Sequence, residues 1–83
     1  MIKKVLVANR GEIACRIIKT LSRLGIESSV VFSREDEGSL AVEMADKSFL
    51  LKDPENKSQE YLDINQIIKI AKQNGIDAVH PGY

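Results

Sequence analysis

The apolar positions of the chain fall into four short runs, separated by polar loops and by stretches with helical periodicity. The first run, Val5-Leu6-Val7-Ala8, is continuous, as is typical of a strand buried on both faces of a parallel sheet. We predict this strand over residues 4–8 and further strands over residues 28–33, 48–51 and 77–80. The first strand leads directly into a turn and a helix, and such junctions are where open α/β proteins build their sites.

The first helix is predicted over residues 11–24. Its apolar side is formed by residues at helical spacing, which are Ile13, Ile17, Leu21 and Leu24, widened by Ala14 and Ile18. A basic stripe on another face of the same helix comprises Arg16, Lys19 and Arg23. Gly25 is placed to end the helix in a left-handed conformation, with Ile26 folding back on the last turn.

Two further helices have recognisable start signals. Ser39 is expected to cap a short helix that ends at residue 44 or 45. Asp63 and Gln66 have the spacing of a capping box at the start of a third helix. The buried side predicted for this third helix comprises Ile64, Ile67, Ile68 and Ala71. Gly75 is expected to end it in the same way that Gly25 ends the first helix.

The alternation of strands and helices predicts an α/β fold with a four-stranded parallel sheet and right-handed crossovers. We expect the strand order 3-2-1-4, with the first two helices on one face and the third on the other. This arrangement is a three-layer α/β sandwich. The order reverses between the first and fourth strands, so their carboxyl ends should bring Asn9, Arg10 and Gly11 close to residues 80–83.

Composition and charge narrow the functional classes. A chain of 83 residues with 43% hydrophobic and 29% charged positions is typical of a single globular domain. Its net charge of zero gives no support for binding to nucleic acid or to an anionic membrane. No apolar run approaches the roughly 20 residues of a membrane span. Cys15 is the single cysteine, which excludes an internal disulfide, and we interpret it as a packing residue. We expect a cytoplasmic protein.

The turn after the first strand lacks the common signatures of a nucleotide site. No P-loop motif occurs, and Gly11 is a single glycine where the dinucleotide fingerprint has three. Glu35 and Asp36 lie where a ribose-binding acid would follow the second strand, but a solvated acidic loop is the favoured interpretation. Arg10 has two open roles, as an anion site or as the partner of a carboxylate such as Glu12.

The segment His80-Pro81-Gly82-Tyr83 carries the most candidate chemistry. A histidine that closes a strand can titrate, bind a ligand or satisfy backbone groups, and for His80 alone the structural role is favoured. Pro81 and Gly82 define an unusual exit that presents the Tyr83 ring and hydroxyl at the functional edge of the sheet. The sequence stops directly after this strand, so we expect residues 1–83 to be part of a longer protein.

Residues 4–14, with Asn9-Arg10-Gly11-Glu12, and residues 78–83 resemble the paired motifs of the biotin carboxylase N-terminal domain. The resemblance extends over the whole chain and implies a Rossmann-like, pre-ATP-grasp domain that precedes an ATP-grasp domain. The reaction it implies uses MgATP to activate bicarbonate as carboxyphosphate, which supplies carbon dioxide for carboxylation of N1 of biotin on a carrier protein. ATP and Mg²⁺ or Mn²⁺ would be held by later residues, so no catalytic residue is expected within residues 1–83.

The resemblance also implies roles for individual residues. Tyr83 matches a tyrosine that lines the biotin pocket, and His80 and Gly82 match the motif that shapes the pocket loop. Arg16 matches a position in the helix through which bacterial enzymes dimerise. The resemblance implies a homodimer formed through the N-terminal and C-terminal domains of the parent, and the interface residues expected in this chain are Arg16, Lys19 and Arg23. Lys19 and Arg23 depart from the bacterial subunit sequences, in which an acidic residue takes the place of Arg23. The implied partners are a biotin carboxyl carrier protein or domain and a carboxyltransferase, which sets the final acyl acceptor.

Two other classes of function stay open at this point. One is a non-catalytic interaction domain that uses the basic face from Arg16 to Arg23, a face that is otherwise interpreted as solvated. The other is the pre-ATP-grasp domain of a ligase that does not use biotin. Substrate choice by the full-length protein distinguishes these possibilities.

Overall fold

The computed structural model describes residues 1–52 and 64–81. The elements of these two segments are β1 (Lys4–Val7), α1 (Gly11–Arg23), β2 (Glu27–Phe32), the 3₁₀ turn η1 (Arg34–Asp36), α2 (Leu40–Met44), β3 (Lys47–Leu50), α3 (Ile64–Gln73) and β4 (Ala78–His80). The predicted strands and helices are present, and the boundaries differ by a single residue where they differ. Asp63, the expected first half of the capping box, lies outside the described residues. Within the described ranges no helix has both the length and the apolar character needed to cross a membrane.

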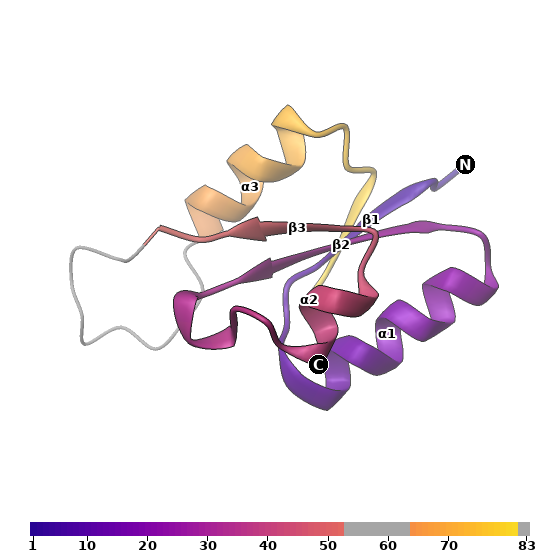
Figure 1. Cartoon of the computed structure of the whole chain (residues 1–83). Helices are drawn as coiled ribbons and strands as arrows, with labels where there is room; N and C mark the ends of the chain where they lie inside the picture. The colour runs from indigo at the N-terminus through magenta and orange to yellow at the C-terminus, as the bar shows by residue number, and fades with distance from the viewer. Residues whose placement is uncertain (53–63, 82–83) are drawn as a thin grey trace.

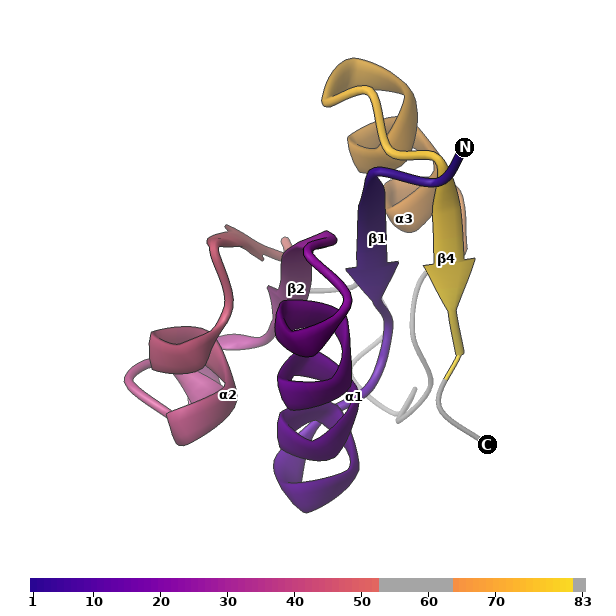
Figure 2. The ribbon, with the colours of Figure 1, turned by 90° about the vertical axis from the view of Figure 1, so that its right-hand side faces the viewer.

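The strands form one parallel sheet in the order β3-β2-β1-β4, which confirms the expected topology. Figure 1 shows α1 and α2 on one side of the sheet and α3 on the other. Figure 2 shows β1 and β4 side by side and running in the same direction. The fold is therefore a three-layer α/β sandwich whose strand order reverses between β1 and β4. Such a reversal is where open α/β sheets have room for a site.

The side of α1 that packs on the sheet agrees with the expected side only in part. The buried residues are Ala14, Ile18 and Leu21. Ile13 and Leu24, which were expected to be buried, are 47% and 66% exposed. Because successive helical residues are about 100° apart, the apolar positions of α1 span an arc of about 140°. Leu21 and Ala14 lie near the middle of this arc, Ile18 at one edge and Ile13 and Leu24 near the other, so packing on the sheet buries the side of the arc that ends at Ile18.

The prediction for the buried side of α3 is wrong in part for the same reason. Ile67 is buried, and Ile70 and Ala71 pack with it against the opposite face of the sheet. Ile64 and Ile68 are instead 68% and 46% exposed. The helix is rotated so that Ile70, rather than Ile68, lies beside Ile67 on the sheet.

Both long helices end at a glycine with left-handed backbone, as predicted. The φ angle is 72° at Gly25 and 65° at Gly75. The isoleucine after each glycine donates its N–H to a carbonyl in the last turn, at 2.9 Å for α1 and 3.0 Å for α3. The prediction for α2 is also confirmed, because the Ser39 side chain accepts a hydrogen bond from the Val42 N–H at 3.4 Å.

Candidate functional site

The exits of β1 and β4 meet at the carboxyl edge of the sheet. The last pair in their register joins Val7 to His80, and the Ala8 N–H donates to the His80 carbonyl at 2.9 Å. One residue further on, Asn9 Nδ2 donates to the Pro81 carbonyl at 3.1 Å. The prediction that the first and last strands bring Asn9 close to the His80-Pro81 segment is therefore confirmed.

Asn9 uses both polar atoms of its side chain. While Nδ2 bonds Pro81, Oδ1 accepts a hydrogen bond from the Arg10 N–H at 2.7 Å. Arg10 is the N-cap residue of α1, and its own side chain makes no capping bond. The next residue, Gly11, has a φ of 66°, which a residue with a Cβ rarely adopts. This left-handed glycine lets the chain turn from β1 directly into α1, with Asn9 at the turn.

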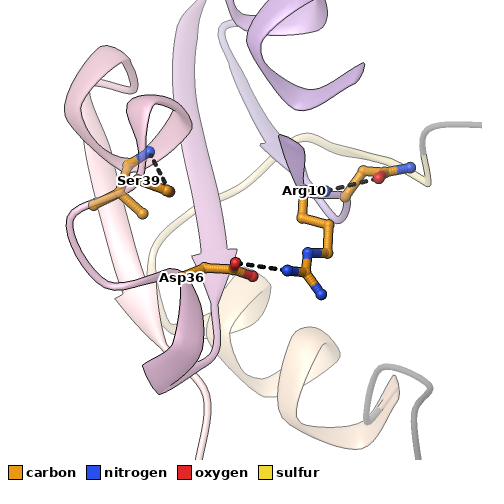
Figure 3. Close-up of polar contacts among 5 residues, drawn as sticks. Arg10, Asp36 and Ser39 are labelled. Carbon is orange, nitrogen blue, oxygen red and sulfur yellow. Dashed lines mark hydrogen bonds and ion pairs between the residues drawn. The ribbon is translucent and has the colours of Figure 1, made fainter. Parts of the chain in front are cut away.

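Arg10 connects the same turn to the loop after β2. Its guanidinium forms an ion pair with Asp36 Oδ1 at 2.8 Å, and Figure 3 shows the two groups pointing toward one another. The Arg10 side chain is 69% exposed and that of Asp36 19%, so the net free energy of the pair is about 1 kcal/mol or less. Arg10 was expected either to bind an anion or to pair with a carboxylate, and in the structure it pairs with the carboxylate of Asp36. Asp36 is engaged in that pair, although its position after β2 is the one a ribose-binding acid would occupy.

The predicted biotin-pocket loop is described only as far as Pro81. His80 is exposed at the end of β4. It is paired with Val7, which belongs to the apolar cluster under α1, so the His80 side chain lies on the α1 face of the sheet. Gly82 and Tyr83 lie outside the described residues, and their assignment to the biotin pocket stays a prediction.

A cavity of about 630 Å³ opens at the same edge, on the α3 face of the sheet. Its apolar wall includes the exposed residues Ile64, Ile68 and Val79, and Asn9 and Arg10 contribute polar groups to its lining. The apolar pattern of α3 carried a signal for this cavity. The pattern has more apolar positions than one helix face can bury, and the surplus residues line the opening.

The basic stripe of α1 is exposed to solvent along its whole length. Arg16, Lys19 and Arg23 are all exposed residues. A second cavity, of about 330 Å³, lies between α1 and α2, and Lys19 and Arg23 belong to its lining together with Met44. The face therefore combines a row of cations with a concave surface. Cys15, on the same helix, is partly buried and packs against the core cluster, as its interpretation as a packing residue requires.

One contact that connects β1 to β4 was not predicted from the sequence. Asp77, just before β4, accepts hydrogen bonds from the backbone N–H groups of Lys3 and Lys4 at 2.8 and 2.9 Å. These two bonds, that to Lys3 first, hold the pKa of the Asp77 carboxyl below its ordinary value. Asp77 therefore ties the amino ends of β1 and β4 together, while Asn9 ties their carboxyl ends. An aspartate before a short strand carries no sequence signal for this role.

Among residues 1–52 and 64–81, no group of three or more His, Cys, Asp or Glu side chains is arranged to hold a metal ion. The described part of the site consists instead of backbone groups held by an amide, together with one ion pair.

Comparison with known proteins assigns this arrangement to a family. The family described as "Biotin carboxylase, N-terminal domain" matches residues 1–83. Biotin carboxylase 1 of Bacillus subtilis (strain 168) is 49% identical over 83 residues, which are 100% of this chain and 18% of that protein. Mitochondrial pyruvate carboxylase of Rattus norvegicus is 50% identical over 82 residues, which are 99% of this chain and 7% of that protein.

A solved structure of a biotin carboxylase domain has the same fold as this chain. The biotin carboxylase domain dimer of Hydrogenobacter thermophilus 2-oxoglutarate carboxylase, in complex with MgADP, ADP and bicarbonate, superposes with a TM-score of 0.88 at 41% identity. The match covers 100% of this chain and 18% of that chain. The chain thus spans less than a fifth of the length of these biotin carboxylase relatives. On the evidence of its sequence and its fold, the chain belongs to the biotin carboxylase N-terminal domain family.

Proposed function

We propose that the chain acts as the N-terminal domain of a longer, ATP-dependent biotin carboxylase. In this proposal the whole protein uses MgATP and bicarbonate to carboxylate biotin on a carrier protein. The observation that carries the proposal is the family match over residues 1–83, combined with the small share, 18%, that the chain covers of a biotin carboxylase relative. The other 82% of that relative's length is long enough to contain an ATP-grasp domain.

We propose that the part of this chain in the reaction is to hold biotin and not to transfer phosphate. Phosphoryl transfer depends on metal ions and on cations around the transferring group. Arg10, a cation at the carboxyl edge of the sheet, is already paired with Asp36. We therefore assign ATP and Mg²⁺ or Mn²⁺ to parts of the protein outside residues 1–83, where the metal would neutralise charge on the phosphates.

Biotin is the cofactor that this chain is proposed to contact directly. Tyr83 is proposed to line the biotin pocket, and His80 and Gly82 to shape the loop that leads to it. An aromatic ring with a hydroxyl group suits a neutral, partly apolar ureido ring, because it offers both contact area and a hydrogen bond. The tie between Asn9 and the Pro81 carbonyl supports this role, since it fixes the backbone immediately before Gly82 and Tyr83.

The proposed partners are a biotin carboxyl carrier protein or domain, a carboxyltransferase and a second copy of the protein. The exposed stripe of Arg16, Lys19 and Arg23 supports a homodimer contact. The 2-oxoglutarate carboxylase relative is described as a domain dimer. The acyl acceptor, such as acetyl-CoA, pyruvate or propionyl-CoA, would be chosen by the carboxyltransferase. We propose the cytoplasm as the site of action.

The proposal is tested by the ATPase activity of the full-length protein. We expect ATP cleavage to require bicarbonate and to be stimulated by free biotin. An ATPase rate that is indifferent to both would contradict the proposal. The isolated 83-residue chain should bind neither ATP nor biotin tightly, and calorimetry that detected tight ATP binding would contradict the division of labour proposed above.

Substitution of Tyr83 tests the biotin pocket itself. In the full-length protein, Tyr83→Ala should raise the KM for free biotin by about tenfold or more, because an aromatic contact and a hydrogen bond are lost together. The KM for ATP should change much less. Tyr83→Phe keeps the ring and should have the smaller effect. A larger change in the KM for ATP than in that for biotin would remove Tyr83 from the pocket.

A further inference from the structure

We infer that Asn9 is a positioning residue for the proposed biotin pocket, holding the backbone at Pro81, the last described residue before Gly82 and Tyr83. This inference rests on the function proposed above. The carboxamide of Asn9 donates to the Pro81 carbonyl at 3.1 Å and accepts from the Arg10 N–H at 2.7 Å. It therefore joins the start of α1 to the exit of β4, two segments that are far apart in the sequence.

The exit of β4 needs a side chain to hold it. β4 is a strand of only three residues at the edge of the sheet, and β1 is its neighbour in the strand order. The pairing of β4 with β1 reaches His80. The next residue, Pro81, has no N–H and cannot donate a ladder hydrogen bond. Its carbonyl is the group through which the backbone at this point is tied to β1, and Asn9 provides the donor.

Asn9 is itself held in place from the other side. Its Oδ1 is bonded to the N-cap residue of α1, and the side chain of that residue, Arg10, is paired with Asp36 in the loop after β2. A contact chain therefore runs from the β2 loop through the start of α1 to Pro81. Because this series of contacts fixes the Asn9 side chain at Oδ1, the bond from Nδ2 can restrain the position of Pro81.

The two hydrogen bonds of Asn9 can be separated by substitution in the full-length protein. Asn9→Asp removes the Nδ2 donor to Pro81 but keeps an acceptor for the Arg10 N–H, whereas Asn9→Ala removes both. Both variants lose the bond to Pro81, so each should raise the KM for free biotin about fivefold or more, as expected for the loss of that hydrogen bond. The KM for ATP should stay within about twofold of wild type, because a general loss of structure would raise both.

Asn74→Asp is the matched control. Asn74 Nδ2 donates to the Ile70 carbonyl at 2.8 Å at the end of α3, so the control makes the same chemical change at another backbone carbonyl. It should leave both KM values unchanged. If Asn9→Asp behaves like Asn74→Asp, or if it raises the KM for ATP as much as that for biotin, the inference is wrong.

Amide hydrogen exchange of residues 78–83 separates this inference from the proposed function. Exchange in this segment should accelerate in Asn9→Asp and Asn9→Ala but not in Asn74→Asp, because losing the tie lets the end of β4 open more often. Unchanged exchange would overturn the positioning role even in an active enzyme. A wild-type protein whose ATP cleavage ignores biotin would instead overturn the proposed function, and the assignment of Asn9 to a biotin pocket with it.

Discussion

Two neighbouring serines in β2 show how closely stability depends on single polar atoms. Ser28 and Ser29 are both buried, with 2% and 1% of their surface exposed. The Ser28 hydroxyl donates to Asp46 Oδ2 at 3.3 Å and accepts from the Asp46 N–H at 3.2 Å. The Ser29 hydroxyl, on the opposite face, has no hydrogen-bond partner within the part of the chain that the structure describes. A buried polar group without a partner destabilises the folded state.

Alanine substitutions at these positions should therefore act in opposite directions. Ser29→Ala should raise the free energy of unfolding by about 1 kcal/mol, because it removes an unpaired hydroxyl. Ser28→Ala should lower it by about 1 kcal/mol or more, because the Asp46 carboxylate and N–H lose a partner. Urea denaturation of the two variants measures both changes. Effects of the same sign would contradict this account of the two hydroxyls.

Asp77 makes stability depend on acid pH. Its carboxylate accepts the Lys3 and Lys4 N–H groups, which lowers its pKa in the folded state. A lowered pKa means that the contact stabilises the fold fully above the unfolded value of about 3.9 and is lost as the pH falls through the lower folded value. Wild-type protein should therefore lose more stability between pH 7 and about pH 3 than Asp77→Asn. Urea denaturation at the two pH values tests this, and parallel losses in both proteins would contradict it.

At the scale of elements, periodicity predicted the position of each helix but not its rotation. The apolar arcs of α1 and α3 are wider than the surface that the sheet covers, so several residues compete for burial. The sheet covers one side of each arc, which in α3 buries Ile67 and leaves Ile64 exposed. That choice depends on how helix and sheet dock, which no pattern within a single helix contains. The helix ends were predictable because Gly25 and Gly75 supply a local backbone conformation that other residues rarely adopt.

The rotation of α3 can be measured with two substitutions of the same type. Ile67→Ala should lower the free energy of unfolding by about 2–4 kcal/mol, because it leaves a cavity in the core. Ile64→Ala, on the same helix but 68% exposed, should change it by no more than about 0.5–1 kcal/mol. Urea denaturation of both variants gives the comparison. A larger loss for Ile64→Ala would mean that the buried side expected from the sequence pattern is the correct one.

At the scale of the whole molecule, topology brought together the two exits that form the candidate site. The alternation of strands and helices was enough to predict that β1 and β4 are neighbours, and with them Asn9 and Pro81. The individual hydrogen bonds were not predictable, because they depend on distances that exist only after the layers have packed. Arg10 had several carboxylates within reach along the sequence, and the loop after β2 delivers Asp36 to it. Asp77 gave no signal because its partners are backbone groups of Lys3 and Lys4.

Charge reversal on α1 tests the proposed assembly of the full-length protein. Arg16→Glu combined with Lys19→Glu should raise the dimer dissociation constant by at least about tenfold, because like or unpaired charges at an interface are unfavourable. Lys69→Glu combined with Lys72→Glu is the matched control, with the same spacing and the same change in charge on the exposed side of α3. Sedimentation velocity measures both. An unchanged dimer in the α1 variant would remove Arg16 and Lys19 from the interface.

The side-chain ties at the two ends of the β1–β4 pair have a consequence for the alignment of these strands. A short edge strand can slide along its neighbour, and a slip of one residue would move Val79 and His80 to opposite faces. Here a slipped strand would forfeit the bonds of Asp77 to Lys3 and Lys4 and that of Asn9 to Pro81 at once. A shifted register therefore loses hydrogen bonds at both ends of β4, and this loss favours a single register for a strand of only three residues.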